Sequence, residues 1–166
     1  YRDVFHIAEG ENPYELEIAL IDDLKPGEVP VLACGKSGRI APWGSLLTTA
    51  SIARGASGCI TDGLVRDIKA IRKLFFPVYH GGIGPLDSKG RGVVAAIDIP
   101  VECGHVRVHP GDLIVGDADG AVAIPRAIED EVLARAFEKV AKEHETEAAL
   151  RRGEKLADVF ARIGVL

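Results

Sequence analysis

The chain has 166 residues, of which 47% are hydrophobic and 27% are charged, with 19 glycines and 9 prolines. This length is enough for one domain with its own hydrophobic core, and the composition excludes a disordered chain. A net charge of −5 leaves no excess of lysine and arginine to neutralise phosphates, so no nucleic-acid partner is expected. No apolar run approaches the roughly 20 residues that span a bilayer. We therefore predict a single domain over 1–166, located in the cytoplasm, without a membrane partner.

Cysteines and histidines show no arrangement that is typical of a metal site or a nucleophile. The three cysteines, Cys34, Cys59 and Cys103, are odd in number and widely spaced, which predicts buried, reduced thiols rather than disulfides or a zinc site. The five histidines lack an i, i+4 pair, and no Gly-x-Ser-x-Gly motif indicates a serine hydrolase. His80 precedes a glycine-rich stretch, where a site-lining role and a simple loop role both stay open.

The first half of the chain predicts strands that alternate with helices. Asn12 and Pro13 suit the start of a helix, and Pro26-Gly27 suits its end. Such alternation is typical of an α/β layer. The expected elements are, in order, a helix over 14–24, a strand over 29–34, a helix over 45–54, a strand over 58–61 that ends at Asp62-Gly63, a helix over 66–73 and a strand over 76–79.

The second half of the chain predicts hairpins and then two long helices. Short β-rich runs at 93–97, 105–108, 113–115 and 121–124 are separated by Pro110-Gly111 and Asp119-Gly120, which are hairpin signals. Amphipathic helices are expected over 128–150 and 154–163, and the first of them is rich in glutamate and lysine. We expect this charged tail to pack on a neighbouring subunit, and therefore expect a homo-oligomer.

Two loops match known ligand-binding motifs only in part. Gly35-Lys36-Ser37-Gly38 follows a strand, but the phosphate-binding pattern needs a glycine where Pro30 stands. The segment Asp117-Ala-Asp119-Gly120 looks like the start of a calcium loop, but position twelve of that loop would be Ile128 instead of glutamate. We therefore expect a glycine loop and a plain Asp-Gly turn.

The best candidates for a binding site are the segments 43–49 and 61–67. Each leaves a strand or loop and opens a helix, where unpaired N–H groups and the positive end of the helix dipole can hold a carboxylate. Gly44 lets a ligand come close. Arg66 and Asp67 place a permanent cation beside a hard oxygen ligand, which suits a small chelating oxyanion bound through Mg²⁺ or Mn²⁺. On the residues alone, a simple helix cap with a surface cation is the favoured interpretation, and the metal site is the alternative.

Six motifs occur in order along the chain: APWGSLLTTA at 41–50, ARG at 53–55, TDGLVRD at 61–67, DSKGRG at 87–92, VHPGDLIVGD at 108–117 and DGAVAIP at 119–125. Together they resemble the RraA-like family, which includes the metal-dependent 4-hydroxy-4-methyl-2-oxoglutarate aldolases. The resemblance covers essentially the whole chain and implies an α/β fold, a swivelling β/β/α domain that forms trimers or hexamers with sites between subunits. The family's N-terminal helical segment and first strand are expected to be missing here, in line with the absence of methionine.

The resemblance also implies roles for individual residues. Arg66 would contact the C2 oxygen of the substrate, and Asp67 would be the direct protein ligand of Mg²⁺ or Mn²⁺. Glu143 would reach the metal through water from a neighbouring subunit. The backbone N–H groups that would hold the substrate are those of Gly44, Ser45, Leu46 and Leu47.

The implied activity is that of a lyase on small 2-oxo acids, which cleaves aldols or decarboxylates oxaloacetate while the metal and Arg66 stabilise the pyruvate enolate. Ser45 and Ala70 stand at positions where confirmed aldolases or their variants carry a carboxylate. We therefore expect decarboxylation to be favoured over aldol cleavage. The alternative is a non-catalytic regulator, because founding members of the family inhibit ribonuclease E by protein contact. A methyltransferase is not indicated, since no glycine-rich loop with a paired acid suits S-adenosylmethionine.

Overall fold

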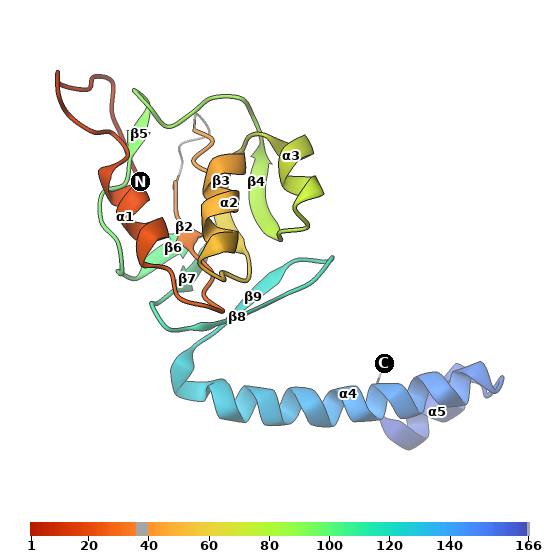
Figure 1. Ribbon diagram of the computed structural model, residues 1–166. Helices are drawn as coiled ribbons and strands as arrows, with labels where there is room; N and C mark the ends of the chain where they lie inside the picture. The colour runs from red at the N-terminus through yellow and green to blue at the C-terminus, as the bar shows by residue number, and fades with distance from the viewer. Residues whose placement is uncertain (36–39, 166) are drawn as a thin grey trace. The chain divides into compact units, whose positions relative to one another are not determined.

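The computed structural model describes residues 1–35 and 40–165, and it separates into two compact units, Tyr1–Ala123 and Ile124–Leu166. The first unit mixes strands with helices, and the second consists mainly of helices (Figure 1). The expected α/β class is therefore confirmed. That both units form one domain stays a prediction, and Lys36, Ser37 and Gly38 of the expected glycine loop lie outside the described residues.

The three helices of the first unit lie close to the positions that the sequence predicted. They are α1 (Glu15–Asp23), α2 (Ser45–Ala53) and α3 (Ile68–Lys73). The strands are β1 (Arg2–Asp3), β2 (Val31–Leu32), β3 (Cys59–Val65), β4 (Val78–Ile83), β5 (Gly92–Val93), β6 (Val101–Cys103), β7 (Val106–Val108), β8 (Leu113–Gly116) and β9 (Ala121–Ile124). Helix α3 begins two residues later than expected, so Arg66 and Asp67 precede it.

A parallel sheet with the strand order β2-β3-β4 organises the first unit. Along β3, every second residue is buried, which leaves the others half-buried. Helix α2 contacts both α1 and α3, and all three helices take part in the packing around the sheet (Figure 1). The buried core cluster consists of Ile21, Leu24, Leu32, Trp43, Cys59, Val65, Ile71 and Phe76. Two members of this cluster, Trp43 and Val65, directly precede the start of α2 and form the end of β3, respectively.

Strand β3 is longer than the sequence predicted. The expectation that Asp62-Gly63 ends the strand is wrong, because β3 continues to Val65. Its pairing with β4 shifts register between Thr61 and Leu64, so the glycine is accommodated as an irregularity inside the strand. A Cβ atom on Gly63 would lie 2.7 Å from the sulfur of Cys34, which leaves no room for a side chain. This continuation carries the chain directly to Arg66 and Asp67.

The remaining strands form short pairs, β1 with β5, β6 with β7 and β8 with β9. The strand expected over 93–97 is confirmed only at Val93, and β6 was not expected at all. The expected Asp-Gly turn joins β8 to β9. There, the Asp117 N–H donates to the Gly120 carbonyl at 2.9 Å, and the Asp119 N–H donates to Asp117 Oδ1 at 2.8 Å.

The three cysteines are free and buried, as the sequence predicted. Burial raises the pKa of the Cys34 and Cys103 thiols to about 11, and it raises the pKa of Cys59 well above its usual range. Thiols in such surroundings stay protonated at neutral pH, which makes them poor nucleophiles. They belong to the packing around β2 and β3.

The second unit contains a short 3₁₀ helix, η1 (Arg126–Ile128), followed by α4 (Glu129–Arg151) and α5 (Leu156–Ile163). Both helices confirm the sequence prediction. They pack on each other, and Ala149 and Val159 are fully buried. Phe137 on α4 stays 72% exposed, and packing of this helix on a neighbouring subunit stays a prediction. None of the helices in the described residues is long and apolar enough to cross a membrane.

Candidate functional site

Two chain segments meet where β3 ends and α2 begins. Trp43 forms a parallel bridge with Val65, and the Arg66 N–H donates to the Trp43 carbonyl at 3.0 Å. The residues that follow each partner are therefore brought side by side. Gly44 and Ser45 come to lie next to Arg66 and Asp67, as the sequence motifs led us to expect.

The start of α2 is fixed by the buried side chain of Trp43. The indole N–H donates to Thr48 Oγ1 at 2.8 Å, and that hydroxyl donates to the Gly44 carbonyl at 3.0 Å. The indole also stacks on Phe76, with ring centroids 6.3 Å apart and planes 9° from parallel. Because Trp43 is fully buried, this arrangement gives the helix start little freedom. A well-fixed helix start can hold a ligand in one orientation.

Asp67 is an exposed carboxylate that Ser45 holds in place. The Ser45 N–H and the Ser45 hydroxyl both donate to Asp67 Oδ2, each at 3.0 Å. These two hydrogen bonds hold the pKa of Asp67 below its usual range. Asp67 itself adopts a left-handed conformation, with φ 61°, as the N-cap of α3. The carboxylate is therefore ionised at neutral pH, and both hydrogen bonds leave its Oδ1 atom unused.

Arg66 is half-buried and held through one end of its guanidinium group. Nη1 donates to the Ala41 carbonyl and lies 3.7 Å from Asp87 Oδ1. A Cβ atom built on Gly44 would lie 3.1 Å from Arg66 Nε and 2.9 Å from Asp67 Oδ2. Gly44 is extended, so glycine is needed here for space rather than for its backbone angles. The missing side chain keeps the guanidinium and the carboxylate close to the start of α2.

An open depression of about 500 Å³ adjoins Asp67. Its lining includes Ser45 and Asp67 together with Lys69 and Lys73 of α3. The two lysines are four residues apart and therefore lie on one face of the helix. The sequence analysis missed them, although their spacing after Asp67 is a signal that could have found them. They add positive charge beside the carboxylate.

Near Arg66 lies a second set of polar residues to which the sequence analysis gave no role, although Asp87 and Ser88 stand in one of the six motifs. The Tyr14 hydroxyl donates to Asp87 Oδ2 at 2.7 Å, and the Ser88 hydroxyl donates to Asp87 Oδ1 at 3.2 Å. Glu17 on α1 is buried, and it accepts a hydrogen bond from the Tyr1 hydroxyl at 2.8 Å. Burial raises the pKa of Glu17, although the nearby Arg66 charge acts in the opposite direction.

The other expected site residues lie in different surroundings. Leu46 on the first turn of α2 is 82% exposed, whereas the side chain of Leu47 packs against the core. Both N–H groups belong to the first turn, where a helix provides no acceptor of its own. Glu143 is in the second unit, where its Oε1 lies 3.3 Å from Lys139 Nζ. His80 lies on β4 rather than in a loop, and its role at the site stays a prediction.

The residues around Asp67 fit a metal that is held mostly by water and substrate. Within residues 1–35 and 40–165, no three side chains of the histidine, cysteine, aspartate or glutamate type gather as a metal-binding group. A closed structural site is therefore not indicated. Asp67 supplies one ionised and exposed oxygen ligand of the kind that Mg²⁺ and Mn²⁺ prefer.

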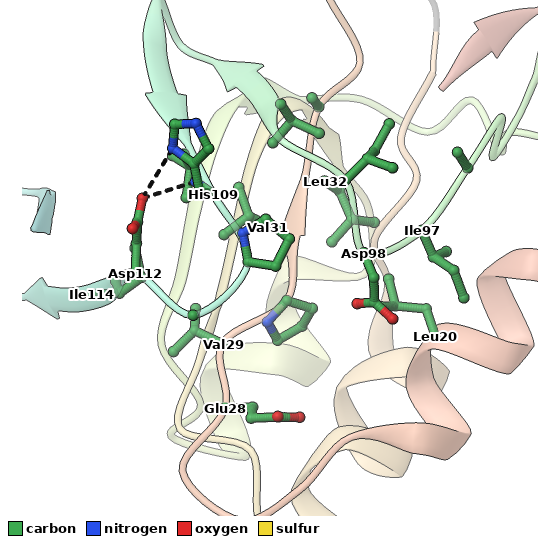
Figure 2. Close-up of a pocket in the computed structure, with 18 of the residues that line it drawn as sticks. Leu20, Glu28, Val29, Val31, Leu32, Ile97, Asp98, His109, Asp112 and Ile114 are labelled. Atoms are coloured by element: carbon green, nitrogen blue, oxygen red, sulfur yellow. Dashed lines mark hydrogen bonds and ion pairs between the residues drawn. The ribbon is translucent and has the colours of Figure 1, made fainter. Parts of the chain in front are cut away.

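A larger cavity, of about 670 Å³, lies elsewhere in the first unit (Figure 2). Apolar side chains such as Val31, Leu32 and Ile97 dominate its lining (Figure 2). His109 at its edge is held by Asp112, whose Oδ2 accepts the His109 N–H at 2.8 Å. Neither Arg66 nor Asp67 lines this cavity. It is therefore a feature separate from the candidate site.

The fold and this site together define an α/β protein with an ionised carboxylate and an arginine at a helix start. The profile of the RraA-like family, described as Aldolase/RraA, matches residues 6–123. The chain belongs to the RraA-like family.

Relatives of this chain carry aldolase names. A provisionally named 4-hydroxy-4-methyl-2-oxoglutarate aldolase of Halalkalibacterium halodurans is 35% identical over 144 residues, which cover 87% of this chain and 67% of that protein. A provisionally named aldolase of the same kind from Aromatoleum aromaticum is 36% identical over 96 residues, which cover 58% of this chain and 60% of that protein. The chain thus spans between about three fifths and two thirds of the length of these relatives.

Solved structures share the fold. An uncharacterized protein from Pseudomonas syringae matches with a TM-score of 0.79 at 30% identity, covering 84% of this chain and 70% of that one. RraAS2 from Streptomyces coelicolor, described as an unusual member of the RNase ES inhibitor RraA protein family, matches with a TM-score of 0.72 at 30% identity, covering 87% and 71%. The expected RraA-like fold is therefore confirmed.

Proposed function

We propose that this chain acts as a divalent-metal-dependent lyase on small 2-oxo acids, at the junction of α2 and α3. The observation that carries the proposal is the meeting of an ionised carboxylate, Asp67, with the Arg66 guanidinium at a glycine, Gly44, that leaves space beside both. The aldolase names of the relatives support the same reaction class.

The proposed roles follow from the groups that each residue presents. The N–H groups of Leu46 and Leu47 receive the substrate carboxylate at the positive end of α2. A contact with the Ser45 N–H requires sharing, because that group donates to Asp67. Arg66 stabilises the negative charge that moves to the C2 oxygen of the substrate as the C3–C4 bond breaks. Lys69 and Lys73 attract the acid into the depression.

Asp67 is the residue proposed to hold Mg²⁺ or Mn²⁺. Its low pKa keeps the carboxylate free of protons, so a metal does not have to displace one at neutral pH. When bound, the metal would polarise the 2-oxo and carboxylate oxygens of the substrate.

Ser45 bears on which of two cleavage reactions is faster. Aldol cleavage requires a base that takes the proton from the C4 hydroxyl group, and a serine hydroxyl is not a base at neutral pH. Decarboxylation of oxaloacetate needs no such step, because carbon dioxide leaves directly and C3 is protonated afterwards. We therefore propose oxaloacetate as the better of the two substrates, and aldol cleavage as the slower reaction.

The assembly is proposed to be a homotrimer or a hexamer. The exposed Phe137 on α4 supports a contact between subunits, since a large apolar side chain gains from being covered. Glu143 on the same helix is then available to a neighbouring site through water. The single domain over 1–166 and its place in the cytoplasm remain parts of this proposal.

The test is pyruvate release from oxaloacetate and from 4-hydroxy-4-methyl-2-oxoglutarate, each with Mg²⁺, with Mn²⁺ and with chelator. We expect protein-dependent turnover above the rate of free metal, faster with oxaloacetate and abolished by chelator. Asp67→Ala should lower turnover at least about 100-fold, a loss that even outer partners of a metal can cause. The matched control is Asp22→Ala, which removes an exposed carboxylate that pairs with Arg54 at 2.9 Å.

The regulator alternative is an outcome of the same test. If the wild-type protein shows no metal-dependent turnover with either acid, the lyase proposal is wrong. Full activity in Asp67→Ala would instead reject only the metal assignment. If the chain instead acts by protein contact, like the RNase ES inhibitor family to which RraAS2 is assigned, Asp67→Ala should leave that function unchanged.

A further inference from the structure

We propose that Asp87 and Tyr14 are positioning residues, which together hold the Arg66 guanidinium group toward Gly44 and the start of α2. This inference rests on the proposed function, because it assigns a task to the groups near Arg66. Neither residue touches Asp67 through any contact described above. Their task is to fix where the positive charge of Arg66 points.

The polar contacts described for the Arg66 side chain involve one nitrogen atom, Nη1. Nη1 donates to the Ala41 carbonyl and lies 3.7 Å from Asp87 Oδ1. A different nitrogen of the same group, Nε, lies beside Gly44. An arginine side chain has several rotatable bonds, so a charge that must meet one developing oxyanion needs a fixed partner. Asp87 supplies that partner at Nη1.

Asp87 is itself held by three donors. Tyr14 donates to Oδ2 at 2.7 Å, while the Ser88 hydroxyl and the Lys89 N–H donate to Oδ1 at 3.2 Å and 3.3 Å. Burial raises the pKa of Asp87, but these hydrogen bonds and the Arg66 charge outweigh it, and the pKa lies below its usual range. Asp87 is therefore a fixed anion rather than a mobile surface carboxylate.

Tyr14 links this anion to helix α1. Burial and the hydrogen bond to Asp87 raise the pKa of Tyr14 to about 12, so its hydroxyl keeps its proton and remains a donor at neutral pH. Tyr14 is the N-cap of α1, and Asp87 lies 73 residues further along the chain. The orientation of Arg66 thus depends on a helix that does not contribute to the site directly.

The same contacts could serve only to tie α1 to the segment that follows β4. Such a purely structural role predicts that variants lower the melting temperature and leave the turnover of the folded protein unchanged. A positioning role predicts the opposite pattern. The two roles therefore separate in a comparison of kcat, KM and stability.

The decisive variant is Asp87→Asn, which keeps an oxygen for Tyr14 but removes the charge that faces Arg66. We expect kcat for oxaloacetate with Mn²⁺ to fall about 10- to 100-fold, because a misplaced catalytic group costs up to that much. KM and the Mn²⁺ concentration that gives half-maximal activity should change less than about threefold, since the proposed substrate N–H groups and Asp67 are untouched. The control is Asp22→Asn, which loses only an exposed ion pair.

Tyr14→Phe tests the chain of contacts. We expect kcat to fall about 3- to 10-fold, the effect of one lost hydrogen bond. In the double variant the loss should equal that of Asp87→Asn alone, because Tyr14 acts through Asp87. Tyr79→Phe is the matched control, since its hydroxyl donates at 2.9 Å to the Asp117 carbonyl, away from Arg66. Additive losses in the double variant would overturn the linked action of the two residues.

A readout without turnover separates this inference from the proposed function. In nitrogen-15 spectra, the Nη–H signals of Arg66, assigned with Arg66→Lys, should exchange with water about 2- to 5-fold faster in Asp87→Asn than in the wild type, because Asp87 Oδ1 lies 3.7 Å from Nη1 and the loss of a partly exposed ion pair has an effect of this size. Unchanged exchange together with unchanged kcat would reject Asp87 as a positioning residue. An inactive wild type with faster exchange in the variant would reject the lyase proposal and keep the positioning.

Discussion

The positive charge of Arg66 acts to lower the pKa of two carboxylic acids, Asp67 and Glu17, but the surroundings of these two groups differ. Asp67 is exposed, and the Ser45 hydrogen bonds hold its pKa below the usual range. Glu17 is 4% exposed, and burial raises its pKa. The difference teaches that hydrogen bonds from a fixed helix start keep a carboxylate ionised, whereas enclosure favours its protonated form. The buried acid, Glu17, instead accepts a hydrogen bond from the Tyr1 hydroxyl.

After Asp67→Ala, the largest effect is expected from Gly44→Ala. The new methyl group would lie 2.9 Å from Asp67 Oδ2, so the carboxylate and the Arg66 side chain must move apart. We expect turnover of oxaloacetate to fall about 100-fold, as misplacement of catalytic groups can cause. Since Gly44 is extended, alanine adds no backbone strain, and the melting temperature should stay nearly unchanged. Wild-type turnover in this variant would show that the closeness of the two groups does not matter.

Ser45→Ala should have a smaller effect than Gly44→Ala. It removes the hydroxyl bond to Asp67 and keeps the bond from the N–H. The affinity for Mn²⁺ should fall about 3- to 10-fold, the effect of one hydrogen bond. The pKa of Asp67 should rise toward its usual range, so metal binding should be lost at a higher pH as the solution is acidified. Calorimetric titration with Mn²⁺ between pH 4 and pH 7, at intervals of about one unit, measures both changes.

The double variant Lys69→Ala/Lys73→Ala tests the depression. Loss of two positive charges beside Asp67 should raise KM for oxaloacetate about 3- to 10-fold at low salt, while kcat stays constant. The effect should shrink as salt is added, because exposed charges are screened. Lys25→Ala/Lys155→Ala is the control pair, since both lysines are exposed and neither lines the depression. Equal changes in both pairs would indicate general attraction to the protein rather than a role of the depression.

The smallest effect, and one on stability alone, is expected from Glu17→Gln. In the wild type the pKa of Glu17 is raised in the folded state, so its contribution to stability is full below the unfolded value and is lost as pH rises through the folded value. The Glu17→Gln variant has no carboxylic acid to titrate at this position, so its stability does not fall in this way as pH rises. Its melting temperature relative to wild type should therefore be higher at pH 8 than at pH 4, by a few degrees for each ~1 kcal/mol. The opposite sign would mean that Arg66 keeps Glu17 ionised.

The sequence predicted one side of the site much better than the other. Gly44, Arg66 and Asp67 stand in short motifs, and the structure brings them together, while their roles in the chemistry stay predictions. Asp87 and Tyr14 are joined only by tertiary structure, 73 residues apart. No periodicity or spacing connects such residues, so single-sequence reasoning could not pair them.

The fold was predictable for a similar reason wherever local signals dominate. The helices α1, α2, α4 and α5 follow their apolar periodicity and end signals closely. Strand β3 was misjudged at Asp62-Gly63 because a glycine that suits a turn here serves a close contact inside the sheet. Glu17 likewise looks like a solvent-facing residue of an amphipathic helix, and only the packing of α1 shows that it is buried.

Trp43 gives this protein a built-in optical probe. It is the one tryptophan in the sequence, it is fully buried, and it directly precedes Gly44. All indole fluorescence of the chain therefore originates beside the proposed metal ligand. Its emission should lie at short wavelengths and shift to the red when α2 loosens, and paramagnetic Mn²⁺ near Asp67 should quench it where diamagnetic Mg²⁺ does not. Occupancy of the site could then be followed in the native protein without any label.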